Sequence, residues 1–266
     1  MSKLKRMWYV KTTHTVNVKK LWILISIFTL SMINSFAQDQ YIFPCGNWPN
    51  TLFLKEIIKL TGKERPKICF LPTASGDSEQ SIIRWYESVH DLSIDPYVQR
   101  VWISSYNQKF TFEEVLLNMD AIVVGGGNTL NMIAIWKAQG IDKVLKMALE
   151  KGIVLSGGSA GSLCWFNKGT TDSRPIELSV VQGLGFLPYS HSPHYDSEGG
   201  RRPLYHENIK NGIFKSGYAM DNNAGIIFKN GQPFKVVSID KKHNCYFVSM
   251  QNGKVIEEKL EATILE

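Results

Sequence analysis

The stretch that decides the fold is IVLSGGSAGSL, residues 153–163. Its first part, Ile153–Ser156, is a short apolar run typical of a buried strand, and an apolar helical stretch, Ser162–Phe166, follows it. Between them Gly157–Gly161 has the pattern G-x-S-x-G, with Ser159 at its centre. A nucleophilic serine requires this strand–turn–helix context, because its backbone is strained and its neighbours must be small. The alternative is a glycine-rich turn without chemistry.

Apolar runs and helical patterns alternate on the N-terminal side of this turn. We expect further strands at Lys67–Leu71, Val98–Ile103 and Asp120–Val124. Helices are expected at Ser78–His90, Phe112–Asn118, Thr129–Lys137 and Ile141–Lys151. Strands that alternate with helices indicate an α/β fold, with a mainly parallel sheet flanked by helices.

The pattern changes after about residue 215. Short strand-like runs are separated there by turn signals such as Asn230-Gly231 and Asn252-Gly253. We expect strands at Gly225–Phe228, Phe234–Ile239, Cys245–Met250 and Val255–Leu260. The sequence therefore predicts one α/β domain over residues 38–266, with a β-rich C-terminal end.

The charge of the chain is unevenly distributed. The 30 Lys and Arg and 24 Asp and Glu give a net charge of +6. Residues 1–37 hold six of the basic residues and no acidic one, so the remainder is neutral. A nucleic-acid-binding protein needs a basic face to neutralise phosphates. We therefore predict no nucleic-acid partner.

Residues 1–37 have the pattern of a signal peptide. A basic segment precedes the uncharged apolar run LWILISIFTLSMI at residues 21–33, and the small residues Ser35 and Ala37 follow it. The apolar run is shorter than the roughly 20 residues that a membrane span needs. We expect no stable membrane span and a protein exported to the periplasm or secreted. Without a functional signal, the protein would be cytoplasmic.

The four cysteines are Cys45, Cys69, Cys164 and Cys245, and no two of them form a C-x-x-C pair. Their spacing therefore does not predict a metal site. Cys69 and Cys164 lie in apolar surroundings and are expected to be buried thiols. In an exported protein, a disulfide between Cys45 and Cys245 is compatible with the sequence.

A second glycine-rich segment, Gly125–Thr129 (GGGNT), follows the predicted strand Asp120–Val124. If the strands are parallel, it lies at the same sheet edge as Ser159, where ligands bind in open α/β sheets. It is not a dinucleotide-binding motif, because Leu130 takes the place of the third glycine, and it lacks the lysine of a Walker loop. We predict that its backbone N–H groups stabilise an oxyanion, and we assign Asn128 to substrate binding.

A serine nucleophile needs a base close to its hydroxyl and an acid that orients the base. His191 and His194 lie in the polar segment SHSPHYD, and they are the candidate bases. Asp172 and Asp221 are the candidate acids. A metal site is the alternative use of this segment, although its spacing matches no known zinc pattern. Its ligands would be His191, His194, Asp196 and Glu198.

Taken together, these motifs resemble the peptidase E (aspartyl dipeptidase) family of serine peptidases, which also includes cyanophycinases. The resemblance extends from about residue 65 to about residue 228. It rests on FLPTASGD (70–77), AIVVGGGNTL (121–130), LSGGSAGSL (155–163), GTTDSRPIE (169–177), GLGFLP (183–188), SPHYDSE (192–198) and YAMDNNAG (218–225). It implies flavodoxin-type layers around a sheet related to class I glutamine amidotransferases, with serine replacing their cysteine.

The resemblance also implies roles for individual residues. Ser159 would be the nucleophile, His194 the general base, and the N–H groups of Gly127 and Ala160 the oxyanion donors. In some members the third catalytic residue directly follows a Thr-Thr-Asn tripeptide, which would place it at Ser173. This chain has an acid one position earlier.

The resemblance thus favours Asp172 as the third member, with Asp221 as the alternative. In peptidase E, an arginine after the histidine motif holds the side chain of an N-terminal Asp. Arg201 or Arg202 would take that role, since Arg suits a bidentate carboxylate contact. The segment Tyr41–Asn50 departs from the pattern, because it lacks the Gly-rich first strand and loop expected there.

These observations predict a serine peptidase that hydrolyses short peptides, with dipeptides that begin with Asp as candidate substrates. No metal or organic cofactor is expected, and the sequence gives no indication of the oligomeric state. One alternative is a non-catalytic protein that binds peptides or acidic metabolites on the same scaffold. Another is an esterase of the α/β-hydrolase type, although only 35 residues separate Ser159 from His194, and that class places its histidine far downstream.

Overall fold

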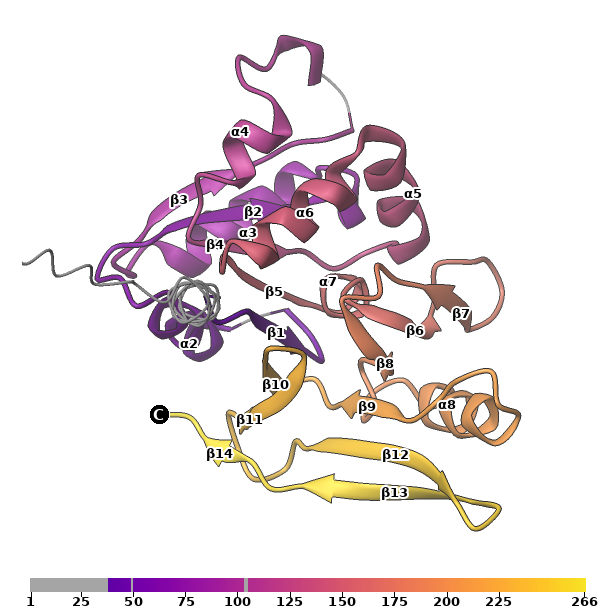
Figure 1. Cartoon of the computed structure of the whole chain (residues 1–266). Helices are drawn as coiled ribbons and strands as arrows, with labels where there is room; N and C mark the ends of the chain where they lie inside the picture. The colour runs from indigo at the N-terminus through magenta and orange to yellow at the C-terminus, as the bar shows by residue number, and fades with distance from the viewer. Residues whose placement is uncertain (1–37, 49, 103–104) are drawn as a thin grey trace, which may run out of the picture. The chain divides into compact units, whose positions relative to one another are not determined.

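Apolar runs of four or five residues form the centre of the larger of two sheets (Figure 1). The structure is a computed structural model that describes residues 38–48, 50–102 and 105–266. The predicted signal peptide, residues 1–37, lies outside the described residues. Residues Asp39–Glu266 form one compact unit.

The eight-stranded sheet has the order β14-β11-β10-β1-β5-β4-β2-β3. The five strands β1, β5, β4, β2 and β3 are parallel to one another, whereas β10 is antiparallel to β1. This confirms the α/β class with a mainly parallel sheet. The strands of this sheet are β1 (Tyr41–Cys45), β2 (Lys67–Leu71), β3 (Asp95–Val98), β4 (Ala121–Val124), β5 (Val154–Gly158), β10 (Ala224–Lys229), β11 (Gln232–Ser238) and β14 (Thr263–Ile264).

The side chains of the parallel strands alternate between two apolar layers. Phe70 and Val123 pack on the face covered by α2 and α3, whereas Leu71 and Val124 pack on the face covered by α4, α5 and α6. Strands buried on both faces explain the uninterrupted apolar runs in the sequence. The helices are α2 (Thr51–Thr61), α3 (Glu79–Val89), α4 (Phe112–Leu116), α5 (Thr129–Gln139) and α6 (Ile141–Glu150). Two 3₁₀ turns, η1 (Thr73–Ser75) and η2 (Ser105–Asn107), lie in the connections.

The first strand, β1, lies in the middle of the eight-stranded sheet between β5 and β10. Tyr41–Cys45 thus supplies the strand that the sequence pattern lacked, and Cys45 pairs with Gly158 in the parallel ladder. The strand needs no glycines of its own, because the apolar residues Ile42 and Phe43 fill the layers on its two sides.

The strand predicted at Val98–Ile103 is misplaced, since β3 spans Asp95–Val98. After β3 the chain leaves the sheet, because the backbone N–H groups of Val101 and Trp102 both donate to Oδ2 of Asp77 (2.5 and 2.7 Å). Val101 is nevertheless buried. Its apolar neighbourhood therefore marks a packed loop rather than a strand.

The six-stranded sheet has the order β13-β12-β9-β8-β6-β7 and mixed strand directions. One face packs against α8 (Arg201–Lys210), and the other joins the main core through Phe166, Tyr218 and Met220. Its strands are β6 (Phe166–Thr171), β7 (Ser179–Gln182), β8 (Leu187–Ser192), β9 (Gly217–Met220), β12 (Cys245–Gln251) and β13 (Lys254–Leu260). All four predicted C-terminal strands are present, divided between the two sheets.

Cys45, Cys69, Cys164 and Cys245 are all buried and free. The disulfide between Cys45 and Cys245 is therefore not formed in this structure. Burial raises the pKa of the Cys69 thiol to about 12 and that of the other three thiols well above the ordinary value. In residues 38–48, 50–102 and 105–266, no helix combines the length and the apolar character that crossing a membrane requires.

Candidate active site

Ser159 occupies the sharp turn between β5 and the short helix α7 (Ala160–Leu163). Its backbone has φ 57° and ψ −120°, a conformation that non-glycine residues rarely adopt. The turn is held in place because the Ser159 carbonyl accepts hydrogen bonds from the N–H groups of Ser162 and Leu163, both at 3.0 Å. Such strain persists where the surrounding structure fixes the residue, and it is concentrated at functional sites.

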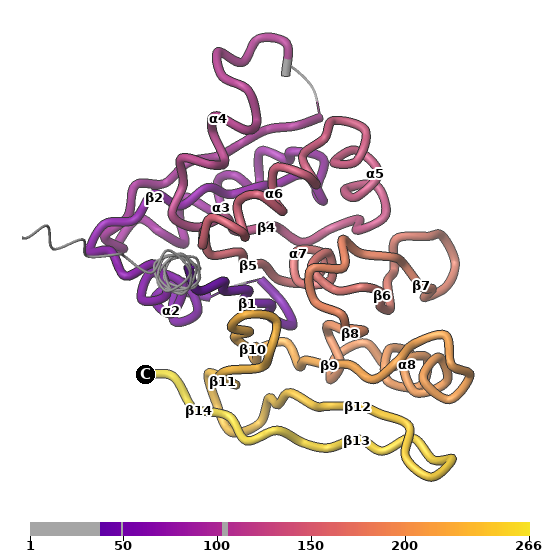
Figure 2. Tube along the Cα trace, in the orientation of Figure 1, coloured from indigo at the N-terminus to yellow at the C-terminus, as the bar shows by residue number. Residues whose placement is uncertain are grey.

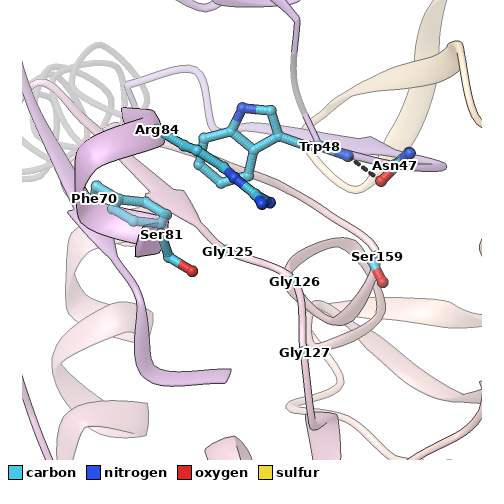
Figure 3. A pocket seen from close by; sticks show the side chains of 9 residues that line it. All are labelled: Asn47, Trp48, Phe70, Ser81, Arg84, Gly125, Gly126, Gly127 and Ser159. Atoms are coloured by element: carbon cyan, nitrogen blue, oxygen red, sulfur yellow. Dashed lines mark hydrogen bonds between the residues drawn. The ribbon is translucent and has the colours of Figure 1, made fainter. Parts of the chain in front are cut away.

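Glycines let the backbone pack tightly around Ser159. A Cβ atom at Gly158 would collide with the carbonyl of Asn47, and one at Gly126 would lie 3.2 Å from Cβ of Ser159. Gly127 has φ 134°, and the next residue, Asn128, donates its N–H to the Ala74 carbonyl at 2.8 Å. The segment predicted to supply oxyanion donors is thus fixed beside Ser159, as Figure 3 shows.

His194 lies next to the serine hydroxyl. Nε2 of His194 is 2.8 Å from Oγ of Ser159, and Nδ1 is 2.7 Å from Oδ1 of Asn222. Because an amide oxygen only accepts hydrogen bonds, Nδ1 of His194 carries the ring proton and donates a hydrogen bond to Oδ1 of Asn222. Nε2 is then unprotonated and accepts the hydrogen bond of the Ser159 hydroxyl. The arrangement therefore joins a serine, a histidine and an asparagine side chain.

His194 and Asn222 come into contact because β8 pairs with β9. The two strands are parallel neighbours, with His191 opposite Tyr218 and Ser192 opposite Ala219. Their carboxyl ends consequently lie at one edge of the six-stranded sheet, where one strand leads into His194 and the other into Asn222. Asn222 lies between the end of β9 at Met220 and the start of β10 at Ala224, and Figure 2 shows the chain passing there from β9 to β10, which belongs to the other sheet.

Asp221 is adjacent to Asn222 in the sequence but does not contact His194. Tyr218 and Met220 pack in the same apolar cluster as Ala160, whereas Ala219 packs on the opposite face with Tyr195. Continued past the end of β9 at Met220, the same alternation would place residue 222 on the side of Ala160 and residue 221 on the opposite side. The same alternation, applied to the sequence, is the signal that could have favoured Asn222.

The carboxyl group of Asp221 is buried behind the site. Its Oδ2 accepts the N–H of Asn244 at 2.7 Å, whereas Oδ1 has no hydrogen-bond partner among the described residues. The pKa of Asp221 is raised to about 6, mainly because the carboxyl group is buried and in part because Asp196 lies nearby, although the hydrogen bond from Asn244 acts in the opposite direction. Asp221 therefore contacts the backbone of Asn244 next to the site and does not contact His194.

Asp172, the other candidate acid, lies at the surface. Its side chain is 63% exposed, and Oδ1 is 3.7 Å from the guanidinium of Arg201. The carboxylate that does lie close to Asn222 is that of Asp196, which accepts the Asn222 backbone N–H at 3.0 Å. Oδ2 of Asp196 is in turn 3.5 Å from Nε2 of His243.

The two arginines predicted to bind substrate are engaged elsewhere. Arg201 is buried and donates to Oε2 of Glu198 (2.6 Å) and to the Thr170 carbonyl (2.7 Å). The Arg202 guanidinium lies over the rings of Tyr195 and Tyr246, with its carbon atom Cζ 4.5 and 5.1 Å from the two ring centroids. Arg202 also pairs with Glu257 at 3.4 Å. Internal ion pairs and cation–π contacts thus hold both side chains.

Asn128 also has a local role. Its Oδ1 caps α5 by accepting the N–H of Asn131 at 2.9 Å, and its Nδ2 donates to the Ser173 carbonyl at 2.9 Å. Both polar atoms of the Asn128 side chain are therefore used within the protein.

His191 is a packed histidine. Its Nδ1 donates to the Tyr218 carbonyl at 2.8 Å, and its Nε2 lies 2.9 Å from Oγ of Ser162. Burial lowers its pKa to about 3, so the ring is neutral. Within the part of the chain that the structure describes, no group of three or more His, Cys, Asp or Glu side chains is placed to hold a metal ion.

A cavity of about 440 Å³ adjoins Ser159 (Figure 3). Gly125, Gly126, Gly127 and Ser159 line it together with Phe70, the first residue of the motif FLPTASGD. Four further lining residues belong to none of the motifs that carry the resemblance: Asn47, Trp48, Ser81 and Arg84. Asn47 and Trp48 follow β1, whose place in the sheet was not expected, and Ser81 and Arg84 come from α3.

Comparisons with known proteins show the family to which the chain belongs. The model of peptidase family S51 matches residues 47–236. The chain is 40% identical over 218 residues to an uncharacterized peptidase, YgaJ, of Bacillus subtilis, which covers 82% of this chain and 93% of that protein. It is 28% identical over 158 residues to peptidase E of Shewanella denitrificans, which covers 57% of this chain and 63% of that one.

The fold is also found in a solved structure. The crystal structure of a peptidase from an acI-B1 Actinobacterium matches with a TM-score of 0.67 at 15% identity, over 85% of this chain and 96% of that one. At this identity the similarity concerns the fold alone. Because the family model spans most of the chain, residues 47–236 of 266, the protein belongs to peptidase family S51 and is a serine-type peptidase.

Proposed function

We propose that the protein hydrolyses short peptides with Ser159 as nucleophile, His194 as general base and Asn222 as the residue that orients the base. The observation that carries this proposal is the chain of contacts from Ser159 Oγ to His194 Nε2 (2.8 Å) and from His194 Nδ1 to Asn222 Oδ1 (2.7 Å). The nucleophile elbow at Ser159, strained and bordered by glycines, presents the hydroxyl for attack.

The first half of the reaction forms an acyl-enzyme. Ser159 Oγ attacks the peptide carbonyl while its proton passes to Nε2 of His194. The imidazolium then gives this proton to the departing amine, and the C–N bond breaks. In the second half, His194 removes a proton from water, the resulting hydroxide attacks the ester, and the Ser159 hydroxyl is restored as the acid product leaves.

The negative oxygen of each tetrahedral intermediate needs fixed hydrogen-bond donors. We assign this role to the backbone N–H groups of Gly127 and Ala160, which flank Ser159 on two sides. The loss of one such donor costs roughly 3–4 kcal/mol in other enzymes. Since both donors are backbone groups, the glycine-rich segment contributes to catalysis through its conformation.

Asn222 differs from the carboxylate of many triads because it carries no charge. It can fix the tautomer and ring orientation of His194, but it does not neutralise the imidazolium. Asp196 supports this arrangement, since its Oδ1 accepts the Asn222 N–H at 3.0 Å and brings a carboxylate close to the site. A neutral orienting residue also serves in the Cys-His-Asn sites of other peptidases.

The decisive experiment is turnover of a dipeptide panel by residues 38–266 and by the Ser159→Ala variant. We expect hydrolysis by the wild type and a loss on the order of 10⁴-fold or more in the variant. Labelling of the wild type, but not of the variant, by a fluorophosphonate probe would locate the nucleophile. Hydrolysis that survives in Ser159→Ala would contradict the proposal.

We also infer that residues 1–37 direct export and are removed after Ala37. The basic segment, the apolar run and the small residues Ser35 and Ala37 support this inference. Expression of the full chain in a bacterial host, followed by fractionation and N-terminal sequencing, tests it. Retention of an uncleaved protein in the cytoplasm would contradict it.

A further inference from the structure

A second serine–histidine contact lies behind the candidate active site. Oγ of Ser162 is 2.9 Å from Nε2 of His191, and both side chains are fully buried. A substrate cannot reach a buried pair, so neither residue can serve as a nucleophile or as a base. A buried polar contact of this kind instead holds its neighbours in place, because breaking it leaves polar atoms without partners.

The proton positions of this pair follow from its contacts. Nδ1 of His191 is 2.8 Å from the carbonyl oxygen of Tyr218, and a carbonyl only accepts hydrogen bonds, so Nδ1 carries the ring proton. Burial lowers the pKa of His191 to about 3, which keeps the ring neutral and leaves Nε2 without a proton. Nε2 therefore accepts a hydrogen bond, and the hydroxyl of Ser162 donates it.

Ser162 also contacts the turn that carries the proposed nucleophile. Its Oγ is 2.8 Å from the carbonyl oxygen of Ser159, which also accepts the N–H groups of Ser162 and Leu163 at 3.0 Å. One hydroxyl group therefore lies between the backbone of Ser159 and the ring of His191, at hydrogen-bond distance from both. A shift of the ring would displace Ser162 and, with it, the serine turn.

The ring of His191 is itself held on several sides. Phe166 stacks on it, with the ring centroids 4.4 Å apart and an angle of 18° between the planes. Gly169 pairs with His191 in the sheet, and a Cβ atom there would collide with the His191 carbonyl and with the side chain of Leu163. The helix α7, which follows the serine turn, is therefore packed tightly against β6 and β8.

His191 belongs to the strand that leads to the other half of the site. It lies in β8, three residues before His194. Its partner in β9 belongs to the strand that leads to Asn222. The contact of His191 with Ser162 thus joins the β8–β9 pair to the serine turn, which comes from the eight-stranded sheet. The 2.8 Å distance between His194 and the serine hydroxyl requires these two units to keep one relative position.

We propose that Ser162 and His191 are positioning residues that hold the serine turn at the distance from His194 that proton transfer needs. Neither residue touches the substrate, and both act through Ser159. A displacement of about 1 Å between reacting groups can cost on the order of 100-fold in rate, so loss of this contact should lower kcat rather than weaken substrate binding. The inference rests on the proposed peptidase function and concerns the geometry of the same site.

The test measures kcat, KM and the rate at which a fluorophosphonate labels Ser159 in Ser162→Ala, His191→Phe and the double variant. Phenylalanine keeps the stacking on Phe166 but removes both ring nitrogens. We expect each single variant to lower kcat and the labelling rate by about 10- to 100-fold, with KM nearly unchanged. The double variant should be no slower than either single variant, because both substitutions remove the same contact. His191→Gln, whose amide oxygen can still accept from Ser162, should recover part of the rate.

Tyr205→Phe is the matched control. It removes the buried hydrogen bond between the Tyr205 hydroxyl and Ser190 (2.8 Å), which joins α8 to the same strand β8. Urea unfolding of all variants shows how much stability each substitution costs. Tyr205→Phe should lower the stability as Ser162→Ala does but leave kcat and the labelling rate unchanged.

Unchanged kcat and labelling in Ser162→Ala and His191→Phe, with turnover still dependent on Ser159, would overturn the inference and leave the peptidase function intact. An equal loss of kcat in Tyr205→Phe would also overturn it, because the loss would then follow stability rather than position. Turnover that survives in Ser159→Ala would contradict the proposed function itself. If the wild type hydrolyses no dipeptide, the labelling rates of the same variants still decide between a positioned and an unpositioned serine.

Discussion

The two sheets contribute to the candidate active site in different ways. The eight-stranded sheet supplies Ser159 from the carboxyl end of β5 and the glycine segment from the carboxyl end of β4. Both lie on parallel neighbouring strands whose register places Val124 opposite Gly157. Regular strand geometry thus positions the proposed nucleophile and the proposed oxyanion donors.

The six-stranded sheet supplies His194 and Asn222 by a less regular route. His194 follows β8 with φ 53°, and Asn222 lies in the turn that returns the chain to the other sheet. The chain passes from the eight-stranded to the six-stranded sheet through Ser159 and α7, and it returns through Asn222. The site therefore lies where the chain crosses between the sheets, and each sheet holds one half of it.

The largest effect is expected when either half of the site is removed. Ser159→Ala and His194→Ala should each reduce kcat by about 10⁴-fold or more, and the double variant should be no slower than either single variant. This non-additivity follows because the two side chains act as one unit. Measurement of kcat for all three proteins on one dipeptide tests it. If the reduction in kcat of the double variant equalled the product of the two single reductions, the two halves would act independently.

A smaller effect is expected at the third residue. Asn222→Ala should reduce kcat by roughly 10- to 100-fold, because His194 keeps its contact with Ser159 but loses its orienting acceptor. Asn222→Asp should retain more activity than Asn222→Ala, since a carboxylate also accepts from Nδ1. Asn223→Ala, one position on, is the matched control. If Asp172→Asn or Asp221→Asn slowed the enzyme more than Asn222→Ala, a carboxylate would be the third member.

The smallest effect concerns the buried carboxyl beside the second half of the site. The pKa of Asp221 is raised to about 6 from an ordinary value of 3.8, so the folded protein holds this proton more tightly than the unfolded chain. The resulting stabilisation is present below about pH 4 and is lost as the pH rises to 6. Asp221→Asn should remove this loss, because asparagine resembles the protonated carboxyl.

Urea unfolding at pH 4 and pH 7 measures the difference. Relative to the wild type, Asp221→Asn should gain about 1–2 kcal/mol of unfolding free energy between the two pH values. Asp172→Asn is the control at an exposed position. An equal pH dependence in Asp221→Asn and the wild type would show that the buried carboxyl does not contribute to it.

The sequence predictions were most accurate for strands that are buried on both faces. The strands at Lys67–Leu71, Asp120–Val124 and Ile153–Ser156 are found within two residues of their predicted ends. They are buried on both faces, so their apolar runs are continuous and easy to recognise. The strand predicted at Val98–Ile103 lies instead at Asp95–Val98. The backbone N–H groups of Val101 and Trp102, which follow this strand, donate to the carboxylate of Asp77 instead of pairing in the sheet.

The site shows the same contrast. Ser159 and Gly127 belong to local motifs, so a few adjacent residues in the sequence determine their surroundings. The partner of His194 depends on β8 lying beside β9, two strands separated by a helix, and on the path of the chain after β9 ends at Met220. Asp221 and Asn222 differ by one position in the sequence, yet only Asn222 contacts His194. Arg84 carries no motif at all.

The sequence by itself determined the α/β class, the strained serine turn and the family to which the chain belongs, because each depends on local periodicity or on short motifs. Only the tertiary structure decided that Asn222 lies at His194, that Arg201 and Arg202 are held by internal contacts, and that Arg84 lines the cavity. These outcomes depend on contacts between segments far apart in the chain. Such contacts are set by strand order and packing, which no short stretch of sequence encodes.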